Sequence, residues 1–233
     1  MSTTLPPERQ QAIRRNAIAL GLGTGAYALS FGALAVSAGL TIWQVQALSL
    51  LMFTGASQFA LIAVIAAGGG AIVAVATAAL IGSRNTFYAV HMSRVLHPRG
   101  WRRLAAAQLT IDESTGMSVG NSESPPAEKY AFWATGIAIF ICWNIGTLIG
   151  SVGAGLLDDP TVLGLDAAGP AAFLALVWPR LTSWPMRAVF AVSLLSAVAL
   201  TPALPPGIPV LLAGVAGVIT GLLLTWRTPR EGT

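Results

Sequence analysis

The chain has 233 residues, of which 55% are hydrophobic and only 9% are charged, and its mean hydropathy is +0.71. Soluble domains carry about a quarter charged residues, so this composition excludes an ordinary water-soluble globule. The net charge of +4 comes from arginines that flank apolar stretches, which argues against nucleic-acid binding. The single cysteine, Cys142, excludes a disulfide within the chain.

Three long stretches, residues 16–83, 130–157 and 188–226, contain no Asp, Glu, Lys or Arg. A helix that crosses a bilayer needs about 20 mostly apolar residues. With glycine, proline and charge as boundaries, we predict about seven transmembrane helices, over 17–39, 43–66, 70–92, 130–155, 163–179, 187–201 and 207–226. The fold class is therefore an all-α polytopic membrane protein of the plasma membrane. Either of the last two spans is alternatively a partial crossing.

The predicted units follow these spans. They are an N-terminal tail, a three-helix unit, a polar connecting segment, a second three-helix unit, a C-terminal helix and a tail, over 1–16, 17–92, 93–129, 130–201, 202–226 and 227–233. The connecting segment is amphipathic over 101–120, which suits a membrane surface. An external N-terminus places nine Lys and Arg residues on the inner side against three outside, as the positive-inside rule favours. The connecting segment then faces the cytoplasm.

The chain also matches itself at an offset of 114 residues. The identities pair Gly32, Leu34, Ser37, Gly39, Leu51, Gly55 and Phe59 with Gly146, Leu148, Ser151, Gly153, Leu165, Gly169 and Phe173. Two copies of three spans give a 3+3 inverted repeat with a seventh helix added, which is a common plan of secondary transporters. Chance similarity in a sequence rich in Ala, Gly and Leu is the other interpretation.

The repeat aligns two predicted helix breaks at mid-membrane, at residues 53–58 and 166–170. Glycine and proline there free backbone groups that need new partners, because no water is available. Broken helices in transporters present half-helix N-termini to an anionic part of the substrate. We therefore predict substrate binding by Thr54, Gly55, Ser57, Gln58 and Gly169. Close packing of small and polar residues between helices is the alternative.

Two charged residues fall inside predicted spans. An arginine in a span costs roughly 2.5–3.5 kcal/mol, so Arg84 is predicted either to bind substrate or to extend to the inner interface near Arg94. Asp166, beside the second break, is predicted to couple transport to protons, or else to cap a half-helix. His91 and His97 have no cysteine or acid close in sequence, so no metal site or cofactor is predicted.

Five stretches together resemble the AzlC/BrnF family, the large subunits of branched-chain amino acid exporters. They are Phe31 to Ala35, Phe53 to Phe59, Arg84 to Tyr88, Ile111 to Ser114, and Leu163 to Leu176. The resemblance implies export of leucine, isoleucine, valine and often methionine, a small hydrophobic AzlD/BrnE-type partner subunit, and coupling to the proton gradient. It is also what makes Asp112 and Glu113 candidate proton-coupling residues.

The chain departs from the family around Arg84. The family usually has Asn-x-Arg-His there, whereas this chain has Gly82 and Asn85 at the flanking positions. This departure bears on the substrate more than on the fold.

Two other classes of function remain as alternatives, a structural membrane subunit and an intramembrane enzyme. The sequence has no His-Glu-x-x-His, no Gly-x-Ser-x-Gly and no paired cysteines, so we predict that it is not an enzyme. A purely structural role does not explain two aligned breaks. There is also no phosphate-binding loop, so active transport is expected to draw on an ion gradient.

Overall fold

The computed structural model describes residues 5–156, 174, 177–178 and 181–227, and over these residues it is helical with no strand. Three helices are long and apolar enough to cross a membrane: α1 (Pro7–Ser37), α8 (Pro125–Gly155) and α11 (Ile208–Arg227). The shorter helices are α2 (Ile42–Leu51), α3 (Ala56–Ala66), α4 (Ala71–Gly82), α5 (Arg84–Leu96), α6 (Trp101–Gln108), α7 (Asp112–Val119) and α10 (Trp184–Leu200). The predicted all-helical membrane class is confirmed.

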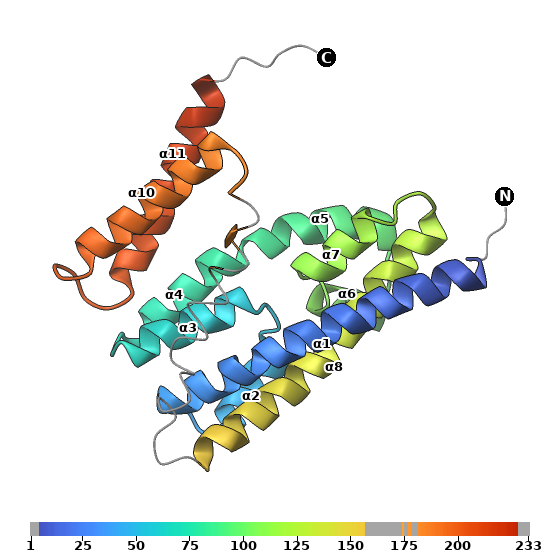
Figure 1. The fold of residues 1–233 in the computed structure, drawn as a ribbon, viewed down its shortest axis with the longest axis horizontal. Helices are drawn as coiled ribbons and strands as arrows, with labels where there is room; N and C mark the ends of the chain where they lie inside the picture. The colour runs from blue at the N-terminus through green and yellow to red at the C-terminus, as the bar shows by residue number, and fades with distance from the viewer. Residues whose placement is uncertain (1–4, 157–173, 175–176, 179–180, 228–233) are drawn as a thin grey trace.

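Helices α1 and α8 lie side by side and run in the same direction (Figure 1). Gly21 lies against the backbone of Ala138, and Gly32, further along α1, lies against Thr147 and Ser151, further along α8. Small residues allow two helix backbones to approach this closely. This tightly packed pair is the scaffold on which the other elements are placed.

The parallel direction of α1 and α8 bears on the predicted repeat, which pairs Gly32 of α1 with Gly146 of α8. Copies related by inversion would place these two helices in opposite directions. For this first helix of each copy the predicted inversion is therefore wrong. The physical reason is the path of the chain between α1 and α8 (Figure 1). It crosses the molecule once, through α4 and α5, whereas the pair α2 and α3 and the pair α6 and α7 each return to the end from which they start.

The first of these pairs, α2 and α3, forms a hairpin, which we call the first hairpin. Leu61 and Ile65 of α3 line the same groove as Gln44 and Leu48 of α2, so α3 returns toward the end at which α2 begins. Each arm has 10 or 11 residues, or about 15 Å, which is half of a bilayer core of about 30 Å. The predicted single crossing over 43–66 is therefore wrong. The predicted break is confirmed, but it reverses the chain.

The second pair, α6 and α7, forms the second hairpin inside the predicted connecting segment. Leu109 at its tip packs against Gly136, and Ser118 further along α7 donates a hydrogen bond to the carbonyl of Glu128 at 3.1 Å. Helix α7 therefore runs from the middle of α8 back to the start of α8. The tip of this hairpin, predicted as part of a polar connecting segment, packs inside the helix bundle against α8. The placement of 93–129 relative to the membrane stays a prediction.

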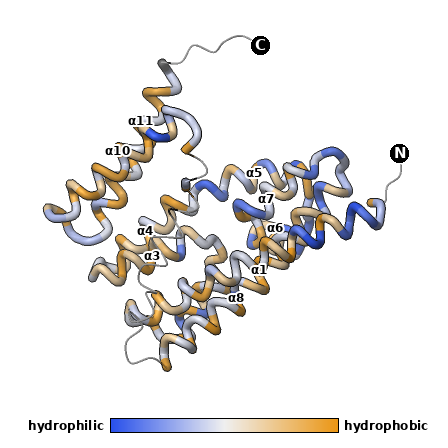
Figure 2. The backbone as a smooth tube through the Cα atoms, viewed as in Figure 1, coloured by the Kyte–Doolittle hydropathy of each residue, from blue (hydrophilic) through white to orange (hydrophobic). Residues whose placement is uncertain are grey.

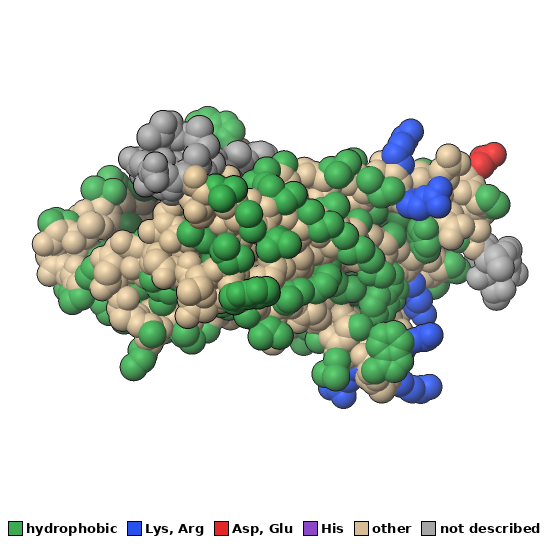
Figure 3. All heavy atoms as spheres, turned by 90° about the horizontal axis from the view of Figure 1, so that it is seen from below, with side chains coloured by type: hydrophobic (Ala, Val, Ile, Leu, Met, Phe, Trp, Pro, Cys, Tyr) green, Lys and Arg blue, Asp and Glu red, His purple; other side chains and the backbone are tan. Residues whose placement is uncertain are grey.

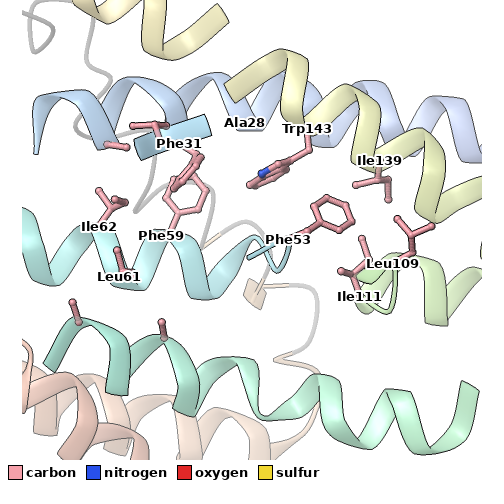
Figure 4. Close-up of a cluster of buried hydrophobic side chains, with 14 of the residues drawn as sticks. Ala28, Phe31, Phe53, Phe59, Leu61, Ile62, Leu109, Ile111, Ile139 and Trp143 are labelled. Carbon is pink, nitrogen blue, oxygen red and sulfur yellow. The ribbon is translucent and has the colours of Figure 1, made fainter. Parts of the chain in front are cut away.

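The two hairpins meet at their tips, which we define as residues 52–55 and 109–111. The Gln108 side-chain amide donates a hydrogen bond to the Leu50 carbonyl at 2.8 Å. Phe53 from the first tip and Leu109 and Ile111 from the second belong to one buried cluster with Ile139 at the middle of α8 (Figure 4). The core of the protein is thus the junction of two half-length hairpins that enter from opposite ends.

Helices α4 and α5 follow one another with only Ser83 between them, in the place of the predicted span over 70–92. Helices α10 and α11 form a hairpin that contacts α4, where Gly214 lies against Leu80, in the place of the last two predicted spans. The predicted span over 163–179, with Asp166 and Gly169, lies almost wholly outside the described residues. Because the stretch over 43–66 returns instead of crossing, the count of seven crossings does not hold for that stretch, and the other spans and the unit boundaries stay predictions.

The charged side chains gather at one end of the molecule, while the long helices are apolar along most of their length (Figures 2 and 3). Arg9, before the apolar part of α1, donates from Nε to Glu123 at 2.9 Å. Hydrogen bonds from its own backbone amide and from Arg9 hold the pKa of the exposed Glu123 carboxyl below its ordinary value. The ion pair places the N-terminal arginines on the same side as the connecting segment. The predicted opposite placement is therefore wrong.

This shared end changes the expected orientation. The basic residues of the N-terminal tail, Arg9, Arg14 and Arg15, and those of the connecting segment, Arg94, Arg99, Arg102, Arg103 and Lys129, then belong to one side of the membrane. The positive-inside rule then predicts an internal N-terminus. With Cys142 replaced by serine, we expect cysteines introduced at the exposed Gln11 and Ser122 to react with an impermeant maleimide in inside-out vesicles only. Reaction of the two positions from opposite sides would contradict the shared end.

Candidate functional site

At the first tip, the break in the backbone is closed by one side chain. Gly55 adopts a φ of +59°, which turns the chain and is readily accessible to glycine. Gln58 is fully buried; its Oε1 accepts from the Gly55 amide at 3.1 Å and its Nε2 donates to the Leu48 carbonyl at 3.1 Å. Both polar atoms of Gln58 are therefore used inside the hairpin. This geometry favours the structural alternative for Gln58 over substrate binding.

At the second tip, buried hydroxyl groups form hydrogen bonds with backbone groups, as the Gln58 side chain does at the first tip. Ser114 Oγ accepts from the Ile111 amide at 3.1 Å, and Thr110 Oγ1 donates to the Ala106 carbonyl at 2.7 Å. The sequence reasoning missed both residues and Gln108, whose amide joins the two tips. A sequence signal for Ser114 was present, because a serine three residues after Ile111 is typical of the first turn of a helix.

The closure at the first tip predicts a stability effect. Replacing Gln58 with leucine keeps the bulk but leaves the half-buried Gly55 amide without its acceptor, which costs about 1–3 kcal/mol. We expect a clearly lower thermal unfolding midpoint in detergent. The matched control is Ser57→Ala, because Ser57 Oγ is buried and has no hydrogen-bond partner among the described residues. Equal midpoints for the two variants would refute the closing role of Gln58.

A pocket of about 370 Å³ lies between the first tip and the junction of α4 and α5. Four of the residues that line it carry a hydroxyl group, Thr54, Ser57, Ser83 and Thr86, and others, such as Met52 and Leu61, are apolar. Two of the predicted substrate residues, Thr54 and Ser57, thus face one pocket. Gly55 forms the turn between them.

Arg84, the first residue of α5, pairs with Asp112, the first residue of α7. Arg84 Nη1 lies 2.7 Å from Asp112 Oδ2, and the side chains are 33% and 13% exposed. Asp112 follows the second tip directly, so the guanidinium lies near the middle of α8. Arg84 is thus paired with Asp112, whereas the alternative was extension to the interface near Arg94. Arg84 stands in sequence between Ser83 and Thr86, two residues of the pocket.

A family comparison covers the part of the chain that builds this junction. The family model described as AzlC protein matches residues 19–157, which is more than half of the chain. The chain belongs to the AzlC family. No curated protein and no solved structure matches it.

Membership confirms the family to which the signature stretches pointed. The matched residues of this AzlC protein run from α1 to the end of α8, so they include both tips, Arg84 and Asp112. The family is associated with membrane transport of amino acids and not with enzymatic activity.

In this AzlC protein, three aromatic side chains pack together next to the first tip. Tyr27 stacks on Phe59 with ring centroids 4.7 Å apart, and Trp143 lies edge-on to Tyr27 at 5.6 Å (Figure 4 shows Phe59 and Trp143). Offset-stacked and edge-to-face pairs of this kind stabilise a rigid core. The first tip therefore rests on a fixed surface formed by α1, α3 and α8.

The remaining predicted site residues fall into two groups. Glu113 is half-buried in the first turn of α7, next to Asp112. Asp166 and Gly169 lie outside the described residues, so the second predicted break has no structural description. Among the described residues, no group of His, Cys, Asp and Glu is arranged to hold a metal ion.

Proposed function

We propose that this AzlC protein is the large subunit of a secondary transporter that exports branched-chain or other small apolar amino acids. The observation that carries the proposal is the ion pair of Arg84 with Asp112, the residue that follows the second tip. Arg84 also follows directly in sequence on Ser83, which lines the pocket at the first tip. Membership of the AzlC family supports the substrate class.

The chemistry of the junction suits a zwitterion with an aliphatic side chain. A guanidinium binds a carboxylate through a planar fork of donors. The hydroxyl oxygens of Thr54 and Ser57 are acceptors for an ammonium group, and Met52 and Leu61 offer an apolar wall. A volume of about 370 Å³ lies within the usual range of small-molecule sites, about 300–1,000 Å³.

The paired hairpins suit alternating access. Each tip reaches the middle of α8 from a different end, so movement of one hairpin would open the junction to one side only. We propose that Asp112, Glu113 and Asp166 couple this movement to protons, because carboxyl groups in a core of low polarity can exchange a proton when their surroundings change.

We also propose a small hydrophobic AzlD/BrnE-type partner subunit. In the most apolar window of α11 only 17% of residues are buried, against 39% in those of α1 and α8. Helices α10 and α11 therefore leave apolar surface for a partner helix or for lipid.

Counterflow in proteoliposomes tests the function directly. We expect vesicles preloaded with leucine to take up labelled leucine, isoleucine, valine and methionine, but not lysine or glutamate, when the small subunit is present. Absence of exchange for every amino acid, with the small subunit present, would reject transport and leave a structural subunit as the interpretation. Full exchange without the small subunit would reject the partner.

A further inference from the structure

The contact between Arg84 and Asp112 uses one side of the guanidinium only. Asp112 accepts at Nη1, whereas Arg84 Nε is buried and has no hydrogen-bond partner among the described residues. Buried donors in native proteins nearly always have an acceptor, so an orphaned Nε at a candidate site indicates a missing ligand. The ligand must be an acceptor, because a guanidinium only donates.

We propose that Arg84 holds two carboxylates when substrate is bound, Asp112 at Nη1 and the substrate carboxylate side-on at Nε and Nη2. This inference rests on the proposed function and adds a positioning residue to it. Asp112 contacts Arg84 and not the substrate. Its role is to fix the plane of the guanidinium so that the free edge faces the ligand.

The position of Asp112 gives this arrangement a second consequence. Asp112 directly follows the second tip, while Arg84 belongs to α5, so the ion pair ties the second hairpin to the substrate residue. A carboxylate bound at the free edge of Arg84 would therefore stabilise the hairpin position that keeps Asp112 in place. Binding and the position of the second hairpin are thermodynamically linked.

The direction in which Asp112→Asn changes the affinity for leucine distinguishes two roles of Asp112, positioning Arg84 or competing with the substrate carboxylate. If Asp112 only occupied the place of the substrate carboxylate, Asp112→Asn would remove a competitor and an adjacent negative charge, and leucine would bind more tightly. If Asp112 positions Arg84, the guanidinium loses its orientation and leucine binds more weakly. We expect the Kd for leucine to rise about tenfold, in line with the loss of one well-aligned charged hydrogen bond.

The experiment measures equilibrium binding of leucine and of leucinol, which lacks the carboxylate, to the purified complex in nanodiscs. We expect weaker leucine binding and unchanged leucinol binding for Asp112→Asn, with a smaller loss of leucine binding for Asp112→Glu, which keeps the charge. The matched control is Glu123→Gln, which breaks the exposed ion pair with Arg9 and should leave both affinities unchanged. If Asp112→Asn does not fold, Asp112→Glu carries the test through the same comparison of the two ligands.

The outcomes are distinct. Tighter or unchanged leucine binding in Asp112→Asn, or equal losses for leucine and leucinol in the folded variants, would overturn the positioning role. If the wild-type complex binds no amino acid at all, the proposed function itself fails.

Discussion

Replacing Arg84 with lysine is expected to weaken leucine binding by at least about tenfold, which corresponds to about 1.4 kcal/mol. Lysine keeps the positive charge but presents a compact ammonium group in place of a planar fork of donors. It can pair with Asp112 or with a substrate carboxylate, but it cannot present an oriented edge to one while holding the other. Equilibrium binding of labelled leucine to the purified complex measures the effect.

The control for this variant is Arg94→Lys, on the same helix but exposed at the charged end of the molecule. We expect leucine affinity in this control to equal that of the wild type, and both variants to elute as monodisperse complexes on size exclusion. An Arg84→Lys protein with wild-type affinity would mean that Arg84 serves the fold and not the ligand.

The second large effect concerns the α1 and α8 pair. A Cβ atom at position 146 would lie closer to the backbone carbonyl oxygen of Gly25 than atoms can approach, and in tight contact with the methyl group of Ala28. Overpacking in a tight core usually costs about 1–3 kcal/mol, and here the obstacle is backbone, which cannot rotate away. We therefore expect Gly146→Val to lower the unfolding midpoint strongly or to prevent stable expression.

Gly153→Val is the matched control, because Gly153 lies on the same helix and a Cβ atom added there would have no heavy atom of a neighbouring element within 4 Å. Its unfolding midpoint should stay close to that of the wild type. If Gly146→Val and Gly153→Val behave alike, the close parallel packing of α1 and α8 is refuted.

Hydropathy was sufficient to predict the helices and the first break. The uncharged run over residues 16–83 identified apolar helices, and Gly55 marked the interruption that the structure confirms. Hydropathy could not show that the chain reverses at Gly55, because two half-length arms are as apolar as one full crossing. That ambiguity also led to the wrong inversion of the repeat, since a returning hairpin changes the direction of every later helix.

The second hairpin was hidden for a different reason. Its polar residues suggested a solvated segment, yet Ser114 and Ser118 are fully buried and bond to backbone groups. Side chains that satisfy backbone at a break look the same in sequence as side chains that face water.

For the ion pair between Arg84 and Asp112, the sequence predicted that Arg84 needs a partner but not which residue that partner is. The cost of an arginine inside a span indicated that Arg84 needs a partner. Asp112 could not be identified as that partner from residue patterns, because the second hairpin that carries it to the middle of α8 was itself missed. The family resemblance alone singled out Asp112.

The most direct test of a substrate site at the hairpin tips uses a cysteine at Thr54, in a Cys142→Ser protein, and follows its reaction with a small thiol reagent. We predict that leucine slows the labelling of Thr54→Cys by at least about tenfold at saturating concentration, since a ligand in about 90% or more of the sites protects them. A cysteine at the exposed Ser122 should react at the same rate with and without leucine. Equal labelling of Thr54→Cys with and without saturating leucine would contradict a substrate site at the first tip.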